Sequence, residues 1–404
     1  MFEILEPQVP DSLLGVMAAF AADADASKVD LGVGVYRDAG GITPVMAAVR
    51  LAEARVLARQ TSKVYVGAGG NRPFAAAMEE LVLGPAHPAH PARSAGRVAT
   101  LQTPGGCGAL RLAAELVQRA SPGATIALSD PSWANHVPLT SGAGLNVVSY
   151  PYYDAARARV LVEPMLAALE RLPAGTIVLL QASCHNPTGA DLAAEEWQAV
   201  AAVLERRGLV PLLDIAYQGL GDGLEADVAP VRALAARLPE LLIAVSCSKN
   251  FGLYRERVGA VMLIAASAAA AAVGMGHLQA LARRIWSMPP DHGAAIVAEI
   301  AGDAALRADW ARELEAMRVR VASLRRELAA ALRVTSQQPA ASGRFDFIER
   351  QCGMFSLLGL PPAAVATLRE QHHVYLAPDS RINVAGLPAA AVERVARAIR
   401  AVVG

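Results

Sequence analysis

Short apolar runs alternate with amphipathic segments between about residues 97 and 265. The apolar runs have the length of strands buried on both faces, and the segments between them have the apolar periodicity of helices. The expected strands are Thr125–Asp130, Thr176–Ser183, Leu209–Tyr217, Leu241–Ser248 and Gly259–Ala266, and the expected helices are Gly108–Ala120, Ala193–Gly208 and Val231–Glu240. This alternation predicts an α/β domain with a mostly parallel sheet, whose ligands bind at the carboxyl ends of the strands.

The pattern changes after about residue 300. A long charged helix is expected over Trp310–Leu332, followed by an alternating stretch over Gly353–Leu360 and a last helix over Ala389–Gly404. This part of the chain reads as a smaller α+β domain.

Composition and charge exclude several classes of protein. The 404 residues carry a formal net charge of zero, whereas nucleic-acid binders need an excess of Lys and Arg. The N-terminus has no basic region typical of a signal peptide. The apolar run Val258–Gly276 is interpreted as a buried strand over Val258–Ile264 followed by an Ala-rich helix, because alanine and glycine favour membrane insertion only weakly.

Four cysteines, Cys107, Cys184, Cys247 and Cys352, contain no Cys-x-x-Cys pair. We therefore expect neither a disulfide framework nor a zinc site, no bound metal, and a reducing, cytoplasmic location.

Lys249 is the first candidate for chemistry. It follows an apolar strand in the segment "SCSKNFGLYRERVG" (Ser246–Gly259), with a serine on either side and Arg257 close behind. A lysine that attacks a carbonyl needs a desolvated site and nearby positive charge to lower its pKa. A structural ion pair would also place a lysine here, so this residue alone leaves both interpretations open.

Polar residues follow two other expected strands. Asp214 lies inside the apolar run "VPLLDIAYQG", where a carboxylate is costly without a partner such as a cationic ring nitrogen, and Tyr217 follows at its end. Asn186 precedes a proline in "SCHNPTG" (Ser183–Gly189), which favours an extended backbone. The ordinary alternatives are a buried Asp bonded to backbone amides and a plain Asn-Pro turn.

Three further segments suit a flat anionic ligand. The glycine-rich turn of Thr103–Val117 opens a helix, whose free amides and dipole attract phosphate. Trp133, in Ser129–His136, could stack on a flat ring or simply cap the core. Arg381, near the chain end, has the donor fork that suits a carboxylate, although a lone arginine is more often a surface residue.

Taken together, these segments describe a pyridoxal phosphate site, and they resemble one family. "SCSKNFGLYRERVG", "CHNPTGADL", "LDIAYQG", "TPGGCGAL" and "SDPSWANH" are similar to the signature stretches of the class I, fold type I aminotransferases, in the aspartate/aromatic amino acid subgroup. The resemblance extends from about Leu31 to Leu387.

The resemblance implies a large cofactor-binding domain over 44–312, with a mostly parallel seven-stranded sheet between helices. It also implies a small C-terminal domain over 313–404 and an N-terminal arm over 1–43 that forms part of the small domain. Active sites would be shared across a homodimer.

The resemblance also implies a role for each candidate residue. Lys249 would form the Schiff base and shuttle the substrate proton, while Asp214, backed by His136, would keep the ring nitrogen protonated. Tyr217 and Asn186 would bond the ring's phenolic oxygen. The phosphate would be held by Gly106, Cys107, Ser246, Ser248, Arg257 and, from the neighbouring subunit, Tyr65. The substrate would meet Gly34, Trp133, Asn186 and Arg381, with Arg283 of the other subunit, next to Arg284, receiving a distal carboxylate.

Two departures bear on activity. Cys107 stands where the family usually has Thr or Ser, and a thiol is a weak donor. Met288 replaces the asparagine of typical aspartate enzymes, so Leu13, Leu14, Val33 and Met288 would line an apolar substrate mouth. This favours transamination of tyrosine and phenylalanine, together with dicarboxylic amino acids, with 2-oxoglutarate in a ping-pong cycle.

Four other functions compare less well with these motifs. A plain aspartate aminotransferase is the nearest, and a related lyase or decarboxylase is disfavoured because both Arg283 and Arg381 are present. A non-catalytic regulator would need a DNA-binding domain before the matched region, where only about 30 residues stand. A nicotinamide dehydrogenase would need Gly-x-Gly-x-x-Gly between a strand and a helix. The sequence does not rank the amino donors.

Overall fold

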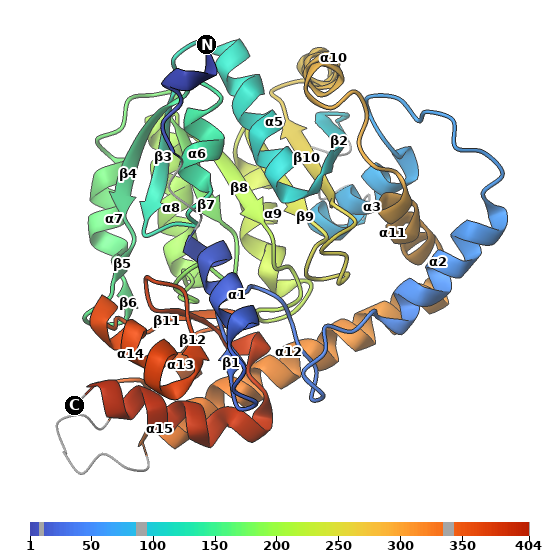
Figure 1. Ribbon diagram of the computed structural model, residues 1–404. Helices are drawn as coiled ribbons and strands as arrows, with labels where there is room; N and C mark the ends of the chain where they lie inside the picture. The colour runs from blue at the N-terminus through green and yellow to red at the C-terminus, as the bar shows by residue number, and fades with distance from the viewer. Residues whose placement is uncertain (8–11, 86–94, 334–342, 404) are drawn as a thin grey trace. The chain divides into compact units, whose positions relative to one another are not determined.

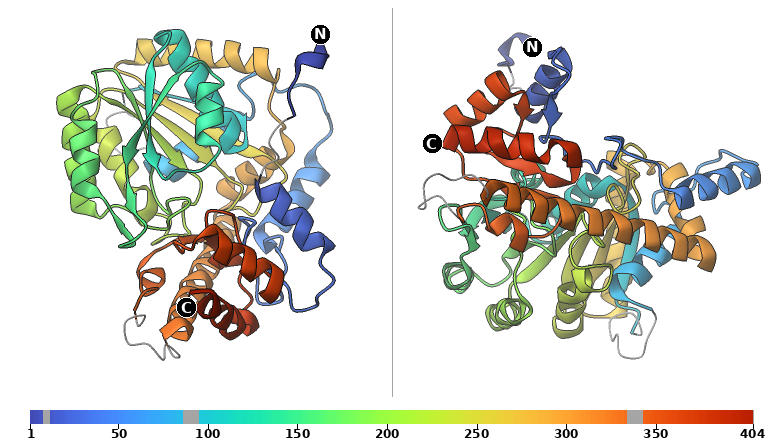
Figure 2. Two further views of the ribbon diagram at one scale, coloured as in Figure 1. Left: turned by 60° about the vertical axis from the view of Figure 1, so that its left-hand side comes forward. Right: turned by 90° about the horizontal axis from the view of Figure 1, so that it is seen from below.

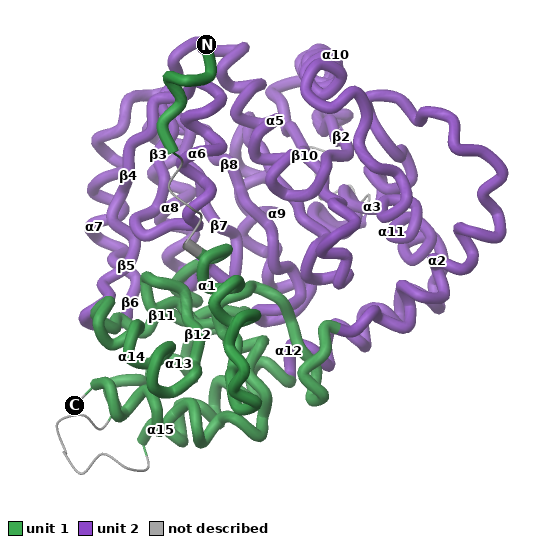
Figure 3. Tube along the Cα trace, in the orientation of Figure 1, with its two compact units in different colours: residues 1–43, 187–189, 320–404 green, residues 44–186, 190–319 purple. Residues whose placement is uncertain are grey.

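The computed structural model describes residues 1–7, 12–85, 95–333 and 343–403. The chain forms two compact units, shown in Figure 3. The larger unit comprises Pro44–Asn186 and Ala190–Val319, and the smaller comprises Met1–Thr43, Pro187–Gly189 and Arg320–Gly404.

The larger unit is built on a seven-stranded sheet with the order β2-β10-β9-β8-β7-β3-β4. These strands are β2 (Val98–Pro104), β3 (Thr125–Asp130), β4 (Asn146–Pro151), β7 (Ile177–Gln181), β8 (Val210–Ile215), β9 (Leu241–Ser246) and β10 (Val258–Ile264). All neighbouring pairs are parallel except those of β10, which runs antiparallel to both β2 and β9. A short antiparallel ribbon, β5 (Tyr153–Asp154) with β6 (Arg159–Val160), is separate from this sheet.

Helices cover both faces of this sheet (Figure 1). One group packs together through α5 (Gly105–Ala120), α6 (His136–Ser141) and α10 (Ala268–Ile285), with α5 contacting β9 and β10. A second group comprises α7 (Val162–Leu169), α8 (Ala194–Arg207), the 3-10 turn Ala226–Val228 and α9 (Ala229–Arg237). Leu110, Ile126, Leu179, Leu212 and Val261 belong to the core between α5 and the strands.

The other helices in the described part of the larger unit lie near β2 and β10 and pack partly on one another. They are α2 (Ala47–Arg59), α3 (Arg72–Leu83), α11 (His292–Gly302) and the first part of α12 (Ala304–Arg333). α11 contacts both α2 and α3, and α3 also contacts β2 and α9. Figure 2 shows the same elements from two further sides.

The smaller unit has two short sheets. β1 (Val29–Asp30) pairs in parallel with β12 (Val374–Tyr375), and β11 (Phe355–Leu357) pairs antiparallel with β13 (Arg381–Asn383). Its helices are α1 (Ser12–Ala22), the rest of α12, α13 (Phe347–Arg350), α14 (Pro362–His372) and α15 (Val392–Val403), with 3-10 turns at Phe2–Ile4, Val384–Gly386 and Ala389–Ala391. The buried Arg325 of α12 donates hydrogen bonds to the carbonyls of Ile348 and Gly353, which anchors the chain before β11.

The prediction of a mostly parallel seven-stranded α/β fold is confirmed. The expected apolar runs became β3, β7, β8, β9 and β10, and the alanine-rich segment became α10, which begins after its N-cap Ser267. No helix in the described ranges combines the length and the apolar character needed to cross a bilayer.

Candidate active site

Adjacent strand ends bring several of the predicted residues of the larger unit together at the carboxyl ends of the central strands. Gln181 at the end of β7 pairs with Asp214 in β8, and Asp214 pairs with Ala244 in β9. Because these strands are parallel, the segments that follow them leave on the same side. Those segments carry Asn186 after β7, Tyr217 after β8 and Lys249 after β9.

Lys249, Tyr217 and Asn186 lie together at this edge. The Lys249 Nζ lies 4.8 Å from the centroid of the Tyr217 ring. The Asn186 Nδ2 donates a hydrogen bond of 3.3 Å to the Tyr217 hydroxyl. Both Asn186 and Tyr217 are buried, so the lysine meets a phenol and an amide in a site largely shielded from water.

Gln181 fixes the backbone of Asn186. The Asn186 N–H donates to Gln181 Oε1 at 2.8 Å, and Gln181 Nε2 donates to the Asn186 carbonyl at 3.0 Å. Together with the extended geometry that Pro187 imposes, this pair of bonds sets the direction of the Asn186 amide. The buried Gln181 had no distinguishing mark in the sequence beyond its place at a strand end.

Asp214 has the partner that a buried carboxylate requires. His136 Nε2 lies 3.1 Å from Asp214 Oδ2, and the His136 Nδ1 lies 2.7 Å from Ser132 Oγ. The imidazole of His136 is therefore oriented from both sides, and it holds one oxygen of the carboxylate. The other oxygen remains available to a ligand at the sheet edge.

Two further groups extend this chain of hydrogen bonds. Ser129 Oγ contacts both Ser132 Oγ, at 3.1 Å, and His185 Nε2, at 3.1 Å. The His185 ring stacks on Tyr152 with centroids 4.1 Å apart. Burial, and secondarily the nearby His136, lowers the pKa of His185 to about 3, so its ring is neutral at neutral pH. Sequence analysis had identified His136 but none of Ser129, Ser132 or His185.

The start of α5 forms a cup that suits a phosphate. A Cβ on Gly105 would come 2.4 Å from Arg257 Nη2, and one on Gly106 would come 3.1 Å from the Ser246 Cβ. Arg257 also donates to Ser248 Oγ at 3.3 Å. Glycines thus allow the helix N-terminus to approach the Arg257 guanidinium and Ser246, while Ser248 contacts the same guanidinium, and this donor set fits a phosphate dianion.

Cys107 lies in the first turn of α5, within this cup. Its sulfur accepts a contact of 3.8 Å from Asn135 Nδ2. The thiol is a weaker hydrogen-bond donor than the hydroxyl of Ser or Thr. A phosphate bound there would therefore depend on backbone amides, the serines and Arg257.

The smaller unit carries the predicted carboxylate fork. The Arg381 guanidinium lies 4.4 Å from the centroid of the Phe355 ring, and its Nη2 donates to the Gly32 carbonyl at 3.0 Å. A Cβ on Gly34 would come 2.8 Å from the edge of the same ring. Arg381 is buried, and its contacts with Phe355 and Gly32 hold its guanidinium in place.

Three further predicted residues belong to the larger unit, and only Trp133 has a contact with one of the groups described above. Trp133 packs edge-on against His136, with centroids 5.2 Å apart. Tyr65 is 84% exposed, and Arg283, exposed near the end of α10, donates to Ser287 Oγ. Their roles toward a ligand or a second subunit remain predictions.

Asp191 is a further residue that sequence analysis missed. Its carboxylate accepts the backbone N–H groups of Cys184, at 2.5 Å, and His185, at 2.8 Å. This contact shapes the turn that leads into Asn186. The signal for it was its place two residues after the Pro-Thr-Gly turn, within "CHNPTGADL".

The family model for aminotransferase class I and II matches residues 26–399. The chain belongs to the class I and II aminotransferases. A curated relative, the aromatic-amino-acid aminotransferase of Pseudomonas aeruginosa, is 50% identical over 389 residues, which cover 96% of each chain. The aspartate aminotransferase of Salmonella typhi is 42% identical, again over 96% of each chain.

Solved structures agree with this membership. The aromatic-amino-acid aminotransferase of Burkholderia pseudomallei, covalently bound to pyridoxal phosphate, matches this aminotransferase chain with a TM-score of 0.95 and 43% identity over 100% of both chains. The resemblance expected from the sequence motifs is thereby confirmed, and so is the fold type I architecture.

Proposed function

We propose that the chain transaminates aromatic amino acids, tyrosine and phenylalanine, and dicarboxylic amino acids with 2-oxoglutarate, in a ping-pong cycle that uses pyridoxal 5'-phosphate. The observation that carries the proposal is the placement of Lys249 over the Tyr217 ring, beside Asn186 and at the same sheet edge as Asp214. The site thus combines a lysine, a phenol, an amide and a carboxylate. These are the groups needed for Schiff-base formation between an amine and a carbonyl compound.

The residues present fit the cofactor. The amides of Gly106 and Cys107, the hydroxyls of Ser246 and Ser248 and the guanidinium of Arg257 would hold its phosphate. Trp133 would cover its ring, and Tyr65 of a second subunit would complete the cup. When bound, pyridoxal phosphate supplies a protonated ring that withdraws electron density from the substrate's alpha carbon.

The chain's own groups would handle the protons. The Asp214 carboxylate, held by His136, favours a proton on a ring nitrogen next to it. Tyr217 and Asn186, which are hydrogen-bonded to each other, would both donate to an oxygen anion of the cofactor ring. The Lys249 amine would hold the cofactor covalently and, once released, carry the proton to and from the alpha carbon. Arg381 would bind the alpha-carboxylate, and Gly34 and Asn186 are also assigned to substrate binding.

The choice of aromatic substrates is supported by the relatives and by the predicted apolar mouth. The relative at 50% identity is an aromatic-amino-acid enzyme, and the aspartate enzyme stands at 42%. Met288 is among the residues assigned to the mouth. The second candidate, an aspartate aminotransferase, is favoured by one feature, the exposed Arg283 that could meet a distal carboxylate. A related lyase or decarboxylase is a remote third.

We also infer a homodimer with shared active sites, working in the cytoplasm. Val64 and Val66 flank Tyr65 in the sequence, and these side chains and that of Leu57 in α2 are exposed and apolar, which suits burial against a second copy. Cys107 and Cys247 are thiols, which fits a reducing compartment. No nucleic acid or membrane partner is proposed.

Replacing Arg283 with leucine is expected to lower kcat/KM for aspartate by about 10²-fold or more, because a charged hydrogen bond to the distal carboxylate is lost. The value for phenylalanine, which has no such carboxylate, should change by less than about threefold. Both values are obtained from steady-state kinetics with each donor.

Arg284 provides the matched control, since it is the adjacent exposed arginine on the same helix. R284L should leave both substrates nearly unaffected. Equal losses for aspartate and phenylalanine in R283L would show that the arginine is misassigned, and a selective loss in R284L would transfer the role to its neighbour.

A further inference from the structure

The turn that carries Lys249 is short and has little regular structure of its own. After β9 ends at Ser246, the chain turns through Lys249 and Asn250, and the Gly252 N–H donates to the Lys249 carbonyl at 3.1 Å. Gly252 has a φ of 65°. The direction of the Lys249 side chain therefore depends on what fixes the peptide groups of this turn.

Trp310, in the first part of α12, fixes one of them. Its indole Nε1 donates a hydrogen bond of 2.8 Å to the carbonyl of Asn250, the residue directly after Lys249. Its ring also stacks on Phe251, with centroids 4.4 Å apart and an interplanar angle of 9°. Trp310 lies 61 residues after Lys249 in the sequence. Its side chain thus contacts two consecutive residues of the turn, Asn250 and Phe251.

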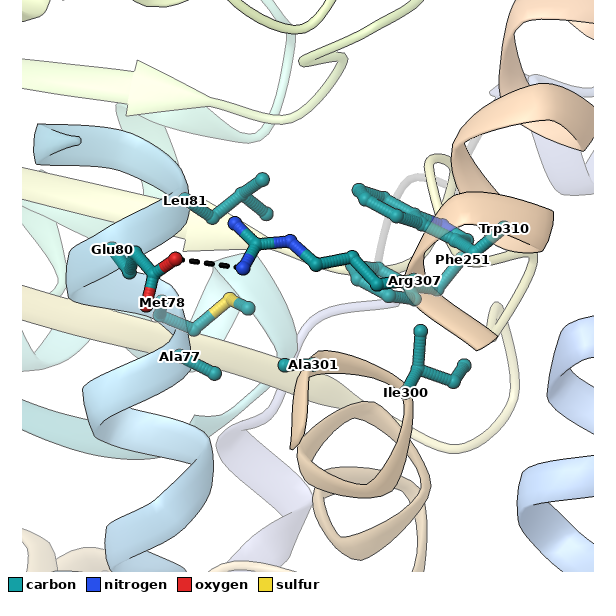
Figure 4. A pocket seen from close by; sticks show the side chains of 9 residues that line it. All are labelled: Ala77, Met78, Glu80, Leu81, Phe251, Ile300, Ala301, Arg307 and Trp310. Carbon is teal, nitrogen blue, oxygen red and sulfur yellow. Dashed lines mark hydrogen bonds and ion pairs between the residues drawn. The ribbon is translucent and has the colours of Figure 1, made fainter. Parts of the chain in front are cut away.

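Trp310 is itself held in place. Figure 4 shows Trp310 and Phe251 at one side of a small hollow, opposite Met78 and Leu81 of α3, with Ile300 of α11 below. Arg307, one turn before Trp310, crosses the hollow and donates to Glu80 Oε1 at 2.7 Å. Both aromatic rings are buried, so the indole cannot exchange its carbonyl partner for water without opening this packing.

We propose that Trp310 is a positioning residue for the reaction: its N–H fixes the Asn250 carbonyl and thereby aims the Lys249 amine over Tyr217. This inference rests on the proposed role of Lys249. A purely structural tryptophan would act through its buried area alone, and that contribution would survive replacement by another large apolar ring. The hydrogen bond to the neighbouring peptide would not.

The test replaces Trp310 with phenylalanine, which keeps a ring against Phe251 but removes the donor. With the cofactor bound, the pH titration of its visible band should shift by about half a pH unit or more, because the Lys249 amine is less well oriented. The kcat should fall about 5- to 10-fold with little change in KM, as expected for one lost hydrogen bond. In the cofactor-free protein, the amides of residues 250–252 should exchange with deuterium faster than in the wild type.

W197F is the control, because Trp197 is also a buried tryptophan of the larger unit but lies in α8. It should leave the band, the kcat and the exchange unchanged. If W310F does not fold, incorporation of benzothienylalanine at position 310 replaces the N–H by sulfur in a ring of nearly the same shape. The same three shifts are then expected.

Unchanged titration, turnover and exchange in the folded variant would overturn the role of Trp310. A second experiment separates failure of the Trp310 proposal from failure of the proposed function. It is borohydride reduction of the cofactor-loaded wild type, followed by peptide mapping. Capture of the cofactor on Lys249 supports the site. Absence of a Lys249 adduct would overturn the site assignment and, with it, the role of Trp310.

Discussion

Lys249→Ala is expected to reduce transamination at least about 10³-fold, because it removes both the covalent attachment and the group that moves the substrate proton. Lys249 stands on a turn after β9 and is only partly buried, so the fold should remain intact. The measurements are steady-state turnover with phenylalanine and aspartate, the visible absorbance of the cofactor, and far-ultraviolet circular dichroism. The variant should lose the first two signals and keep the third.

The other two lysines of the chain, Lys28 and Lys63, supply the control. Lys63 is exposed, and K63A should retain normal turnover and the wild-type visible band. A K249A variant that transaminates at the wild-type rate would show that the reaction uses a different group.

Asp214→Asn is expected to reduce kcat by about 10²- to 10³-fold, because the neutral amide no longer favours a proton on the cofactor's ring nitrogen. Asp214 is buried between β7 and β9, and the shape of asparagine is nearly the same, so stability should change little. Turnover and the visible spectrum of the loaded protein, each followed against pH, provide the measurement.

His136→Asn serves as the comparison, since His136 bonds to Asp214 and would act on the cofactor's ring nitrogen through that carboxylate. The kcat of H136N should be about 10-fold lower than that of the wild type, which is a smaller reduction than in D214N. A wild-type kcat in D214N would contradict the role assigned to Asp214. A larger reduction of kcat in H136N than in D214N would contradict the assignment that His136 acts through Asp214.

The elements and residues that sequence analysis identified share a local signal. β7, β8 and β9 are continuous apolar runs because parallel strands in the middle of a sheet are buried on both faces. Lys249, Asp214 and Asn186 stand out because a polar group at the end of such a run is unusual. The family's motifs then supplied roles that spacing alone left open.

The elements that were missed lack that signal. In β2, buried Thr100, Gln102 and Thr103 interrupt the apolar run, since Gln102 serves to bind Asn71 and Pro290 rather than to fill the core. β4 is the edge strand of the sheet, and most of its side chains are not buried.

Residues that act across long sequence distances could not be found from local patterns. Ser129 and His185 are 56 positions apart, and Trp310 is 60 positions from the Asn250 carbonyl that it binds. A serine or a helical tryptophan looks ordinary until the sheet brings its partner close. For Arg283 and Tyr65, the predicted partner is a second subunit, which a single chain does not contain.

The central claim is that this site transaminates aromatic as well as dicarboxylic amino acids, and a half-reaction tests it most directly. The purified protein, loaded with pyridoxal phosphate, is mixed separately with tyrosine, phenylalanine and aspartate, and the visible band of the cofactor is followed. We expect fast bleaching with both aromatic donors and with aspartate. Bleaching with aspartate alone would contradict the aromatic assignment, and no bleaching with any donor would contradict transamination itself.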